Sequence, residues 1–123
     1  RVGPRRWRRH HQQPRDTSQE VDEEIFAPCA AAALYKREAL IDVGGFDENF
    51  FCYFEDIDLA FRLQLKGYRC LYVPSSRVAH VGSGITGKTS DFTIYHGHRN
   101  LVWTFVKNMP SPLLGRYLFQ HLY

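Results

Sequence analysis

The chain has 123 residues, of which 44% are hydrophobic and 15% are aromatic. This composition predicts one folded domain and excludes an intrinsically disordered chain. No run of about 18 apolar residues occurs, so the sequence predicts no transmembrane helix, and no apolar stretch follows the initial arginines as it would in a signal peptide. Because the first residue is Arg rather than Met, we expect the chain to begin inside a longer protein.

The formal net charge of +3 is unevenly distributed. Residues 1–15 contain six of the 16 basic residues and no acidic one, whereas the rest of the chain has 10 basic against 13 acidic residues. Two prolines and the lack of an apolar period predict an exposed basic arm or loop over residues 1–24. Three interpretations of this arm stay open: a solvated loop, a contact with anionic lipid or lipid diphosphate, and a nucleic-acid patch.

The three cysteines indicate the cellular setting. Cys29, Cys52 and Cys70 are odd in number and form no C-x-x-C pair. This pattern predicts neither a disulfide framework nor a structural zinc site, and it favours a reducing, cytoplasmic environment. We expect all three to be small buried hydrophobic residues.

The first predicted elements lie between residues 24 and 54. The run EIFAPCAAAAL (24–34) predicts a strand followed by small residues that permit close backbone or ligand approach, with a tightly packed helix start as an equal alternative. YKREALIDVGG (35–45) predicts a helix with Ala39, Leu40 and Val43 on one face, stopped by its two glycines. The aromatic stretch 46–54 predicts a turn.

The clearest predicted helix is EDIDLAFRLQLKGY (55–68). Its apolar residues recur at helical spacing, and its acidic residues crowd the first turn, where the helix dipole favours them. YRCLYVP (68–74) and RVAHV (77–81) each predict a short strand. Asp91 is the expected N-cap of a helix that ends before Pro110, and residues 110–123 form a predicted amphipathic tail.

A phosphate-binding loop is suggested by Gly82 to Thr89, which fit G-x-x-x-x-G-K-T. A nucleotide hydrolase needs a buried apolar strand before this loop and a later strand that supplies an acid for Mg²⁺. Here Arg77 and His80 precede the loop, and only 34 residues with a helical pattern follow it. We therefore keep a nucleotide hydrolase fragment only as a remote alternative.

A more specific constellation runs from Val43 to Ser83. It combines a Gly-Gly turn, Phe-Asp-Glu, an aromatic stretch, Glu55-Asp56-x-Asp58 opening a helix, a strand ended by proline, and His80, 24 residues beyond Asp56. Together with PCAAAALYKREAL and a late Arg-Asn pair, this ordered set resembles the second half of the catalytic domain of family-2 inverting glycosyltransferases, in the branch of rhamnosyl- and galactofuranosyltransferase-like enzymes. The resemblance covers residues 25–109 and implies an α/β fold: the acceptor-side half of a GT-A (Rossmann-like) domain, with short strands and flanking helices.

The resemblance implies that Asp56 is the base that deprotonates the acceptor hydroxyl, assisted by Glu55. Amide dipoles at the start of a helix hold such a carboxylate ionised, while neighbouring acids favour its protonation. Asp58 and Phe54 are the residues that we expect to contact the acceptor. The structural alternative is that the acids only cap the helix, with Asp58 paired to Arg62 at i,i+4.

The resemblance also implies a divalent cation, Mg²⁺ or Mn²⁺. His80 would bind it jointly with an Asp-x-Asp motif from the other half of the domain, and imidazole suits Mn²⁺ better than Mg²⁺. Arg99 and Lys88 are expected at the donor diphosphate. No Asp-x-Asp precedes Phe26, so we expect these residues to be part of an enzyme and to be inactive alone.

The predicted function is therefore inverting transfer of a sugar from a nucleotide-sugar donor to a saccharide or lipid-linked acceptor in the full-length enzyme. Peripheral contact with the inner face of the membrane is a further expectation, and nucleic acid is not an expected partner. The alternative is a non-catalytic module, derived from such a domain, that binds carbohydrate or a protein partner. An upstream Asp-x-Asp distinguishes the enzyme from this alternative.

Overall fold

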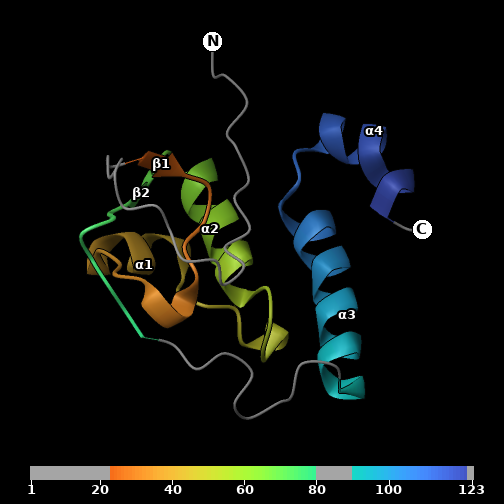
Figure 1. Ribbon diagram of the computed structural model, residues 1–123. Coiled ribbons are helices and arrows are strands. Elements are labelled where there is room, and N and C mark those ends of the chain that lie inside the picture. Colours follow the sequence, from red (N-terminus) through yellow and green to blue (C-terminus); the bar gives the residue numbers. More distant parts are fainter. Residues whose placement is uncertain (1–22, 80–89, 122–123) are drawn as a thin grey trace.

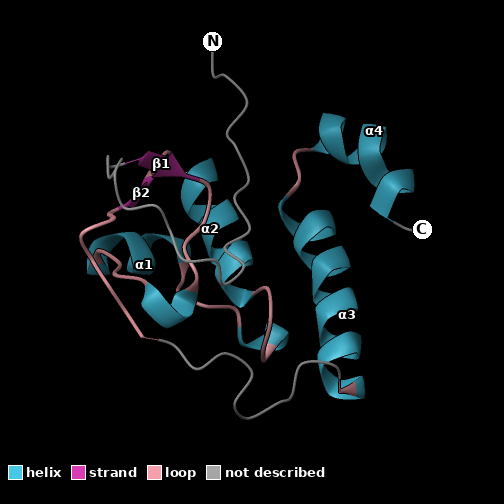
Figure 2. Cartoon of the chain, in the orientation of Figure 1, coloured by secondary structure: helices cyan, strands magenta, loops and turns pink. Residues whose placement is uncertain are grey.

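The structure is a computed structural model that describes residues 23–79 and 90–121, with side chains through residue 118. Within these residues the structure has two short strands, which lie next to each other, and four α-helices (Figures 1 and 2). The predicted basic arm lies outside the described residues except for its last two positions, Glu23 and Glu24, which open a strand.

The sheet is a two-stranded antiparallel pair. Strand β1 (Glu23–Ile25) pairs with β2 (Cys70–Tyr72), with Glu23 opposite Tyr72 and Ile25 opposite Cys70. Both strands were predicted. The strand predicted over residues 77–81 is wrong for its described part, because the structure has no strand at residues 77–79 and Val78 is 57% exposed.

Helix α1 (Arg37–Val43) ends where the two glycines predicted it would. Gly44 takes a left-handed conformation with φ +79°, and the Gly44 and Gly45 amides donate to the Ile41 and Leu40 carbonyls. Glycine is required at such a C-terminal turn because a Cβ would strain it. A short 3₁₀ helix lies on each side of α1 in the sequence: η1 (Ala30–Ala32) precedes it and η2 (Glu48–Phe50) follows it.

Helices α2 (Glu55–Leu65) and α3 (Asp91–Asn108) pack against each other and form most of the core (Figure 1). Ser90, rather than the predicted Asp91, is the N-cap of α3, since its Oγ accepts the Thr93 amide. The core is small and partly polar. Its buried apolar residues are Ala39, Phe50, Leu59, Ala60 and Phe105, and its buried polar residues are Asp58, Asn100, Thr104 and Asn108.

The predicted tail forms a helix, α4 (Ser111–His121), which follows Pro110 and packs against α3. Among the described helices, none is both long enough and apolar enough to cross a membrane. All three cysteines are free thiols, but Cys29 is exposed and the other two are only partly buried. The expectation that all three are buried is therefore wrong: Cys29 lies on the surface, and Cys52 and Cys70 are partly exposed.

Candidate active site

The turn that precedes α2 has an unusual backbone. Phe51, Tyr53 and Phe54 all have positive φ, at 60°, 67° and 67°. Phe51 also has ψ −60°, and the Cys52 amide donates to the Phe50 carbonyl at 2.7 Å, which is a γ-turn of the rare, strained type. Each such non-glycine residue costs on the order of 1–3 kcal/mol. This strained turn (residues 50–54) delivers the chain directly into the first turn of α2.

Asp56 is fixed at the start of α2 by two backbone amides. Its Oδ1 accepts the amide of Ile57 at 2.8 Å, and its Oδ2 accepts the amide of Ala30 at 3.2 Å. Ala30 belongs to the predicted run of small residues. These residues let the backbone come close to Asp56, the predicted base, and the Ala30 amide bonds to it. The side chain is half-buried, so the carboxylate is oriented and still accessible.

Glu55 and Tyr35 are close enough to Asp56 for its charge to raise their pKa values. Burial, and then the charge of Asp56, raise the pKa of Tyr35 to about 12. Burial also raises the pKa of Glu55, with a smaller contribution from Asp56 and an opposing one from its own backbone amide. Tyr35 Oη and Glu55 Oε2 are buried, and neither has a hydrogen-bond partner among the described residues. The sequence did not identify Tyr35, because no spacing rule brings residue 35 to the start of α2.

We expect Glu55→Gln to stabilise the chain at neutral pH. A raised carboxyl pKa means that the folded state favours the protonated form, so ionised Glu55 destabilises it as the pH rises above the ordinary value of 4.5. The neutral amide removes this cost. Urea unfolding at about pH 7 and about pH 3.5 measures the effect. A gain at the higher pH that disappears at the lower one is expected, and an equal gain at both would contradict it.

Asp58 is fully buried and is the centre of a charge cluster. Its Oδ2 accepts from Arg62 at 2.9 Å, and its Oδ1 lies 2.9 Å from Lys107 Nζ and accepts from Asn108 at 2.7 Å. The i,i+4 pair with Arg62, which was the structural alternative, is present. Asp58 therefore offers no exposed atom to an acceptor in this structure, and its geometry is that of a link between α2 and α3.

Arg99 and Asn100 contact the strained turn rather than open solvent. Asn100 is fully buried and donates through Nδ2 to the carbonyls of Phe50, Cys52 and Tyr53. Arg99 donates through Nε to Asn100 Oδ1, and its guanidinium lies 4.3 Å from the centre of the Trp103 ring. The diphosphate contact expected of Arg99 stays a prediction, and it would compete with these bonds.

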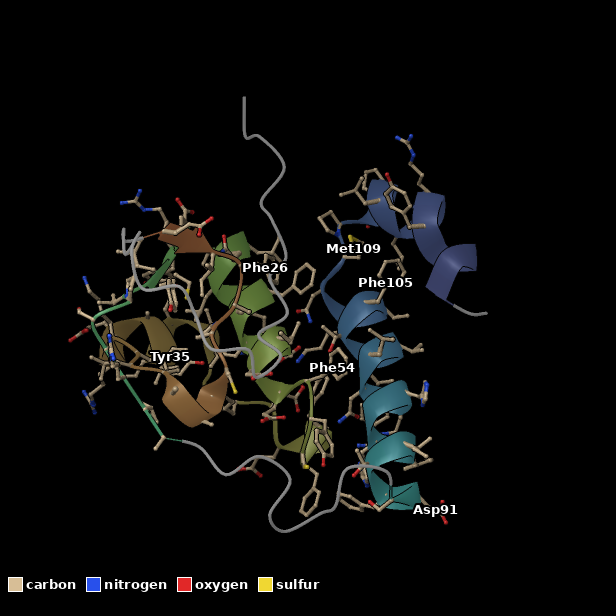
Figure 3. All side chains as sticks on the ribbon, in the orientation of Figure 1. Phe26, Tyr35, Phe54, Asp91, Phe105 and Met109 are labelled. Carbon is tan, nitrogen blue, oxygen red and sulfur yellow. The ribbon has the colours of Figure 1, made fainter. Side chains whose placement is uncertain are left out.

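Of the remaining predicted site residues, the structure describes Phe54 but not His80 or Lys88. Phe54 is half-buried at the N-terminal end of α2 (Figure 3), and its expected contact with an acceptor stays a prediction. His80 and Lys88 lie outside the described residues. Within residues 23–79 and 90–118, no three His, Cys, Asp or Glu side chains gather closely enough to hold a metal ion. The cation expected at His80 stays a prediction.

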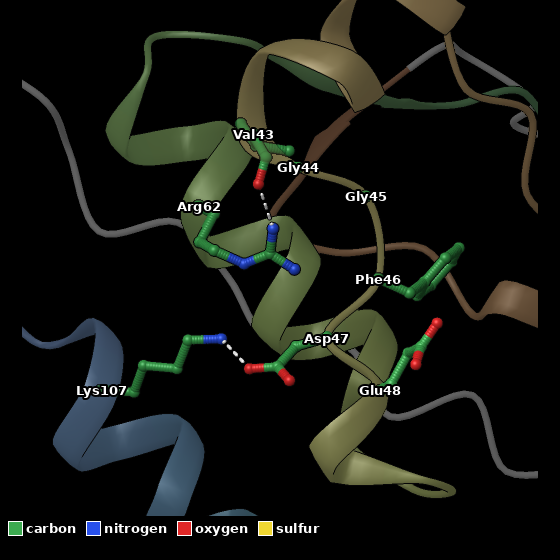
Figure 4. Close-up of a pocket in the computed structure, with 8 residues that line it drawn as sticks. All are labelled: Val43, Gly44, Gly45, Phe46, Asp47, Glu48, Arg62 and Lys107. Carbon is green, nitrogen blue, oxygen red and sulfur yellow. Dashed lines mark hydrogen bonds and ion pairs between the residues drawn. The ribbon is translucent and has the colours of Figure 1, made fainter.

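A shallow pocket of about 460 Å³ lies on another part of α2 (Figure 4). It is lined by the Gly44-Gly45 turn, Asp47 and, from the two central helices, Arg62 and Lys107. Neither Asp56 nor Glu55 lines it. We place the candidate site at Asp56, because the cationic groups of the pocket are already paired with Asp58 and Asp47.

The ion pair across this pocket predicts a pH-dependent stability. Lys107 Nζ lies 2.6 Å from Asp47 Oδ2, and this hydrogen bond, followed by the Asn49 amide, lowers the pKa of Asp47 from 3.8 to about 2. A lowered carboxyl pKa contributes stability above the unfolded value and loses it as the pH falls through the folded value. We expect wild type to exceed Asp47→Asn in free energy of unfolding at about pH 6, with the difference gone near pH 2. A difference that persists in acid would contradict the ion-pair origin.

Comparison with known proteins identifies the class. Residues 24–119 match a family model described as glycosyl transferase family group 2. Because this match spans most of the chain, the chain belongs to that family. Its mixed α/β structure is that of a partial GT-A domain, which confirms the resemblance and the fold class predicted from the sequence.

Two groups of relatives are rhamnosyltransferases. The N-acetylglucosaminyl-diphospho-decaprenol L-rhamnosyltransferase of Mycobacterium tuberculosis is 47% identical over 55 residues, which are 45% of this chain and 18% of that protein. Rhamnosyltransferase WbbL of Escherichia coli is 43% identical over 53 residues, 42% of this chain and 20% of that protein. The chain thus spans about a fifth of the length of these relatives. No solved structure matches it.

Proposed function

We propose that this chain supplies the acceptor side of an inverting glycosyltransferase in which Asp56 is the general base. The observation that carries the proposal is the position of the Asp56 carboxylate, held by the amides of Ala30 and Ile57 at the first turn of α2. The two amide donors fix the direction of the carboxylate, and a general base must be positioned in this way. This placement follows from packing between the alanine run and α2.

The reaction assigned to this site has a simple proton and electron balance. An Asp56 oxygen takes the proton of the acceptor hydroxyl, and the hydroxyl oxygen bonds to the anomeric carbon of the donor sugar. The bond from that carbon to the diphosphate breaks, and its electron pair leaves with the nucleoside diphosphate. Attack opposite to the leaving group inverts the configuration at the anomeric carbon.

Two neighbouring polar groups support an acceptor beside Asp56. Tyr35 Oη and Glu55 Oε2 have no hydrogen-bond partner among the described residues. Buried polar groups are costly unless they are paired. Because both atoms are enclosed in this structure, an acceptor hydroxyl would reach either of them only if neighbouring side chains moved. We propose that Glu55 and Tyr35 orient the acceptor after such a movement, with Phe54 as an apolar contact for the sugar ring.

The donor side depends on residues beyond this description. We propose His80 as a ligand of a divalent cation, shared with an Asp-x-Asp motif in a preceding segment, and Lys88 as a diphosphate contact. When bound, such a cation would neutralise charge on the leaving diphosphate. The residues at Asp56 act on the acceptor and do not require the cation for their own positions.

The relatives favour a lipid-linked acceptor and a rhamnosyl donor. The mycobacterial relative is named as an L-rhamnosyltransferase acting on an N-acetylglucosaminyl-diphospho-decaprenol. We propose the same classes for this chain: a nucleoside-diphosphate deoxyhexose as donor, and a saccharide on a lipid diphosphate as acceptor at the cytoplasmic face of a membrane. Exposed apolar residues on α3 and α4, including Ile94, Leu101 and Leu113, are compatible with a membrane contact.

The test is a transfer assay on the complete gene product that contains residues 1–123. It would be incubated with a panel of nucleotide sugars and a short-chain lipid-diphosphate N-acetylglucosamine, and products would be followed by mass spectrometry. We expect one sugar to be added with inversion, and no turnover by the 123-residue chain alone. Hydrolysis of the donor without transfer to any saccharide, or no reaction with the whole panel, would contradict the proposal.

A further inference from the structure

We infer that Asn100 is a positioning residue: its side-chain amide holds the strained turn 50–54 in the conformation that aims Asp56. This inference rests on the proposed function for its catalytic consequence, but the structural link is independent of it. Asn100 lies in the middle of α3, 44 positions beyond Asp56 in the sequence, and touches neither carboxylate of the Glu55-Asp56 pair.

The turn has carbonyl groups that regular secondary structure does not satisfy. Positive φ at Phe51, Tyr53 and Phe54 removes this stretch from any helix or strand ladder. Three of its carbonyls, those of Phe50, Cys52 and Tyr53, converge on Asn100 Nδ2 at 2.9, 2.8 and 2.7 Å. Two amide hydrogens serve three acceptors, so one hydrogen is shared. All three carbonyls therefore accept hydrogen bonds from one side-chain amide.

The orientation of the Asn100 amide is itself fixed. Its Oδ1 accepts from Arg99 Nε at 2.9 Å, and a guanidinium can only donate. The two ends of the amide therefore cannot exchange without facing Nδ2 to a donor. Arg99 is in turn held by the Trp103 ring and reaches the Asn49 and Phe50 carbonyls at 3.3 Å. Arg99 and Asn100 act together as a clamp on the turn.

The clamp matters because α2 begins where the turn ends. Phe54, the last positive-φ residue, is the N-cap of α2 with φ 67° and ψ −2°, and Asp56 lies two residues later. A relaxed turn would rotate the start of the helix and move the carboxylate away from the Ala30 amide. Asn100→Asp and Asn100→Ala would remove the two N–H donors that the three carbonyls require. Asn100→Gln would keep the donors but place them one methylene farther from the helix.

The helix offers a matched control. Asn108 is also buried on α3 and also donates through Nδ2 to two acceptors, Asp58 Oδ1 and the Thr104 carbonyl, but it does not reach the turn. Asn100→Ala and Asn108→Ala both remove a buried amide from one helix. They differ in whether the lost bonds held the turn.

The first readout is amide hydrogen exchange on the full 123-residue chain. Relative to Gly45, whose amide is bonded within the α1 C-terminal turn, we expect Cys52 to exchange at least about tenfold faster in Asn100→Ala. The ratio in Asn108→Ala should match wild type. Equal ratios in the two variants would overturn the clamp, whether or not both variants lose stability.

The second readout tests the strain directly. Phe51→Gly gives the γ-turn a residue that tolerates positive φ. If Asn100 enforces that conformation, Asn100→Ala should accelerate exchange at Cys52 less in the Phe51→Gly background than in wild type. An unchanged acceleration would overturn the inference, because it would show that the amide bonds do not oppose backbone strain.

The catalytic consequence is measured on the complete gene product. Asn100→Ala should lower kcat at least about 30-fold with the donor KM within about threefold, and Asn108→Ala should keep kcat within about threefold. Normal kcat in a variant with a loosened turn would overturn the positioning role. Failure of the proposed function is seen separately, as undiminished transfer by an Asp56 variant in which the exchange results still hold.

Discussion

Replacing Asp56 with asparagine is expected to lower kcat for sugar transfer by about 10²–10⁴-fold, the range that a positioned general base contributes. Asparagine has nearly the same shape, but its single carbonyl oxygen can accept only one of the two amides, those of Ala30 and Ile57, that the two carboxylate oxygens accept separately. We therefore expect the turn and α2 to be preserved with one of these bonds lost. Asparagine cannot take up the acceptor proton. Initial rates of the complete gene product at saturating donor and acceptor measure the effect.

The matched control is Asp42→Asn on α1. Asp42 is exposed, and its pair with Lys66 is a surface ion pair at 3.4 Å, so the same change there should leave kcat within about twofold. The donor KM should change little in either variant, because the proposed base acts on the acceptor. If Asp56→Asn kept more than about a tenth of the activity, another group would have to be the base.

The second large effect is expected for stability at Asp58. Asp58→Ala removes the partner that Arg62, Lys107 and Asn108 share. Arg62 then loses its buried counter-charge, whereas Lys107 keeps its ion pair with Asp47. Breaking a buried pair in this way costs about 3–5 kcal/mol. Because Arg62 and Lys107 are 17% and 38% exposed and can partly turn to water, we expect a loss near the lower end of this range.

Urea unfolding of the 123-residue chain measures this loss. Asp42→Ala is the control, since it breaks an exposed pair whose side chains are 55% and 43% exposed and should cost less than about 1 kcal/mol. A similar small cost for Asp58→Ala would show that the charge cluster does not hold α2 to α3. It would then reopen the interpretation of Asp58 as an acceptor contact.

The sequence predicted the helices well because their signals are local. The Gly44-Gly45 stop, the acidic first turn of α2 and the end of α3 before Pro110 each depend on a few neighbouring residues. The position of Asp56 at the start of α2 was also predictable, because its acidic run marks the start of a helix; its role as the base stays a prediction. The strand expected at residues 77–79 failed because a strand needs a partner, and partners are not visible in a local pattern.

The support around the base was not predictable. Asp58 is polar and lies on the predicted acidic turn, but only the packing of α3 across α2 makes it buried and paired. The three carbonyls of the strained turn converge on Asn100 because Phe51, Tyr53 and Phe54 all have positive φ, a conformation that no propensity favours for Phe and Tyr. Tyr35 likewise approaches Asp56 only through the fold.

The most direct test of the account is a crystal structure of the complete gene product with a saccharide acceptor and an unreactive donor analogue. We expect the reacting acceptor hydroxyl to lie about 2.6–3.2 Å from an Asp56 carboxylate oxygen, which is the distance over which a general base takes a proton. An acceptor bound elsewhere, with its hydroxyl facing a different carboxylate or imidazole and Asp56 still bonded only to Ala30 and Ile57, would contradict it.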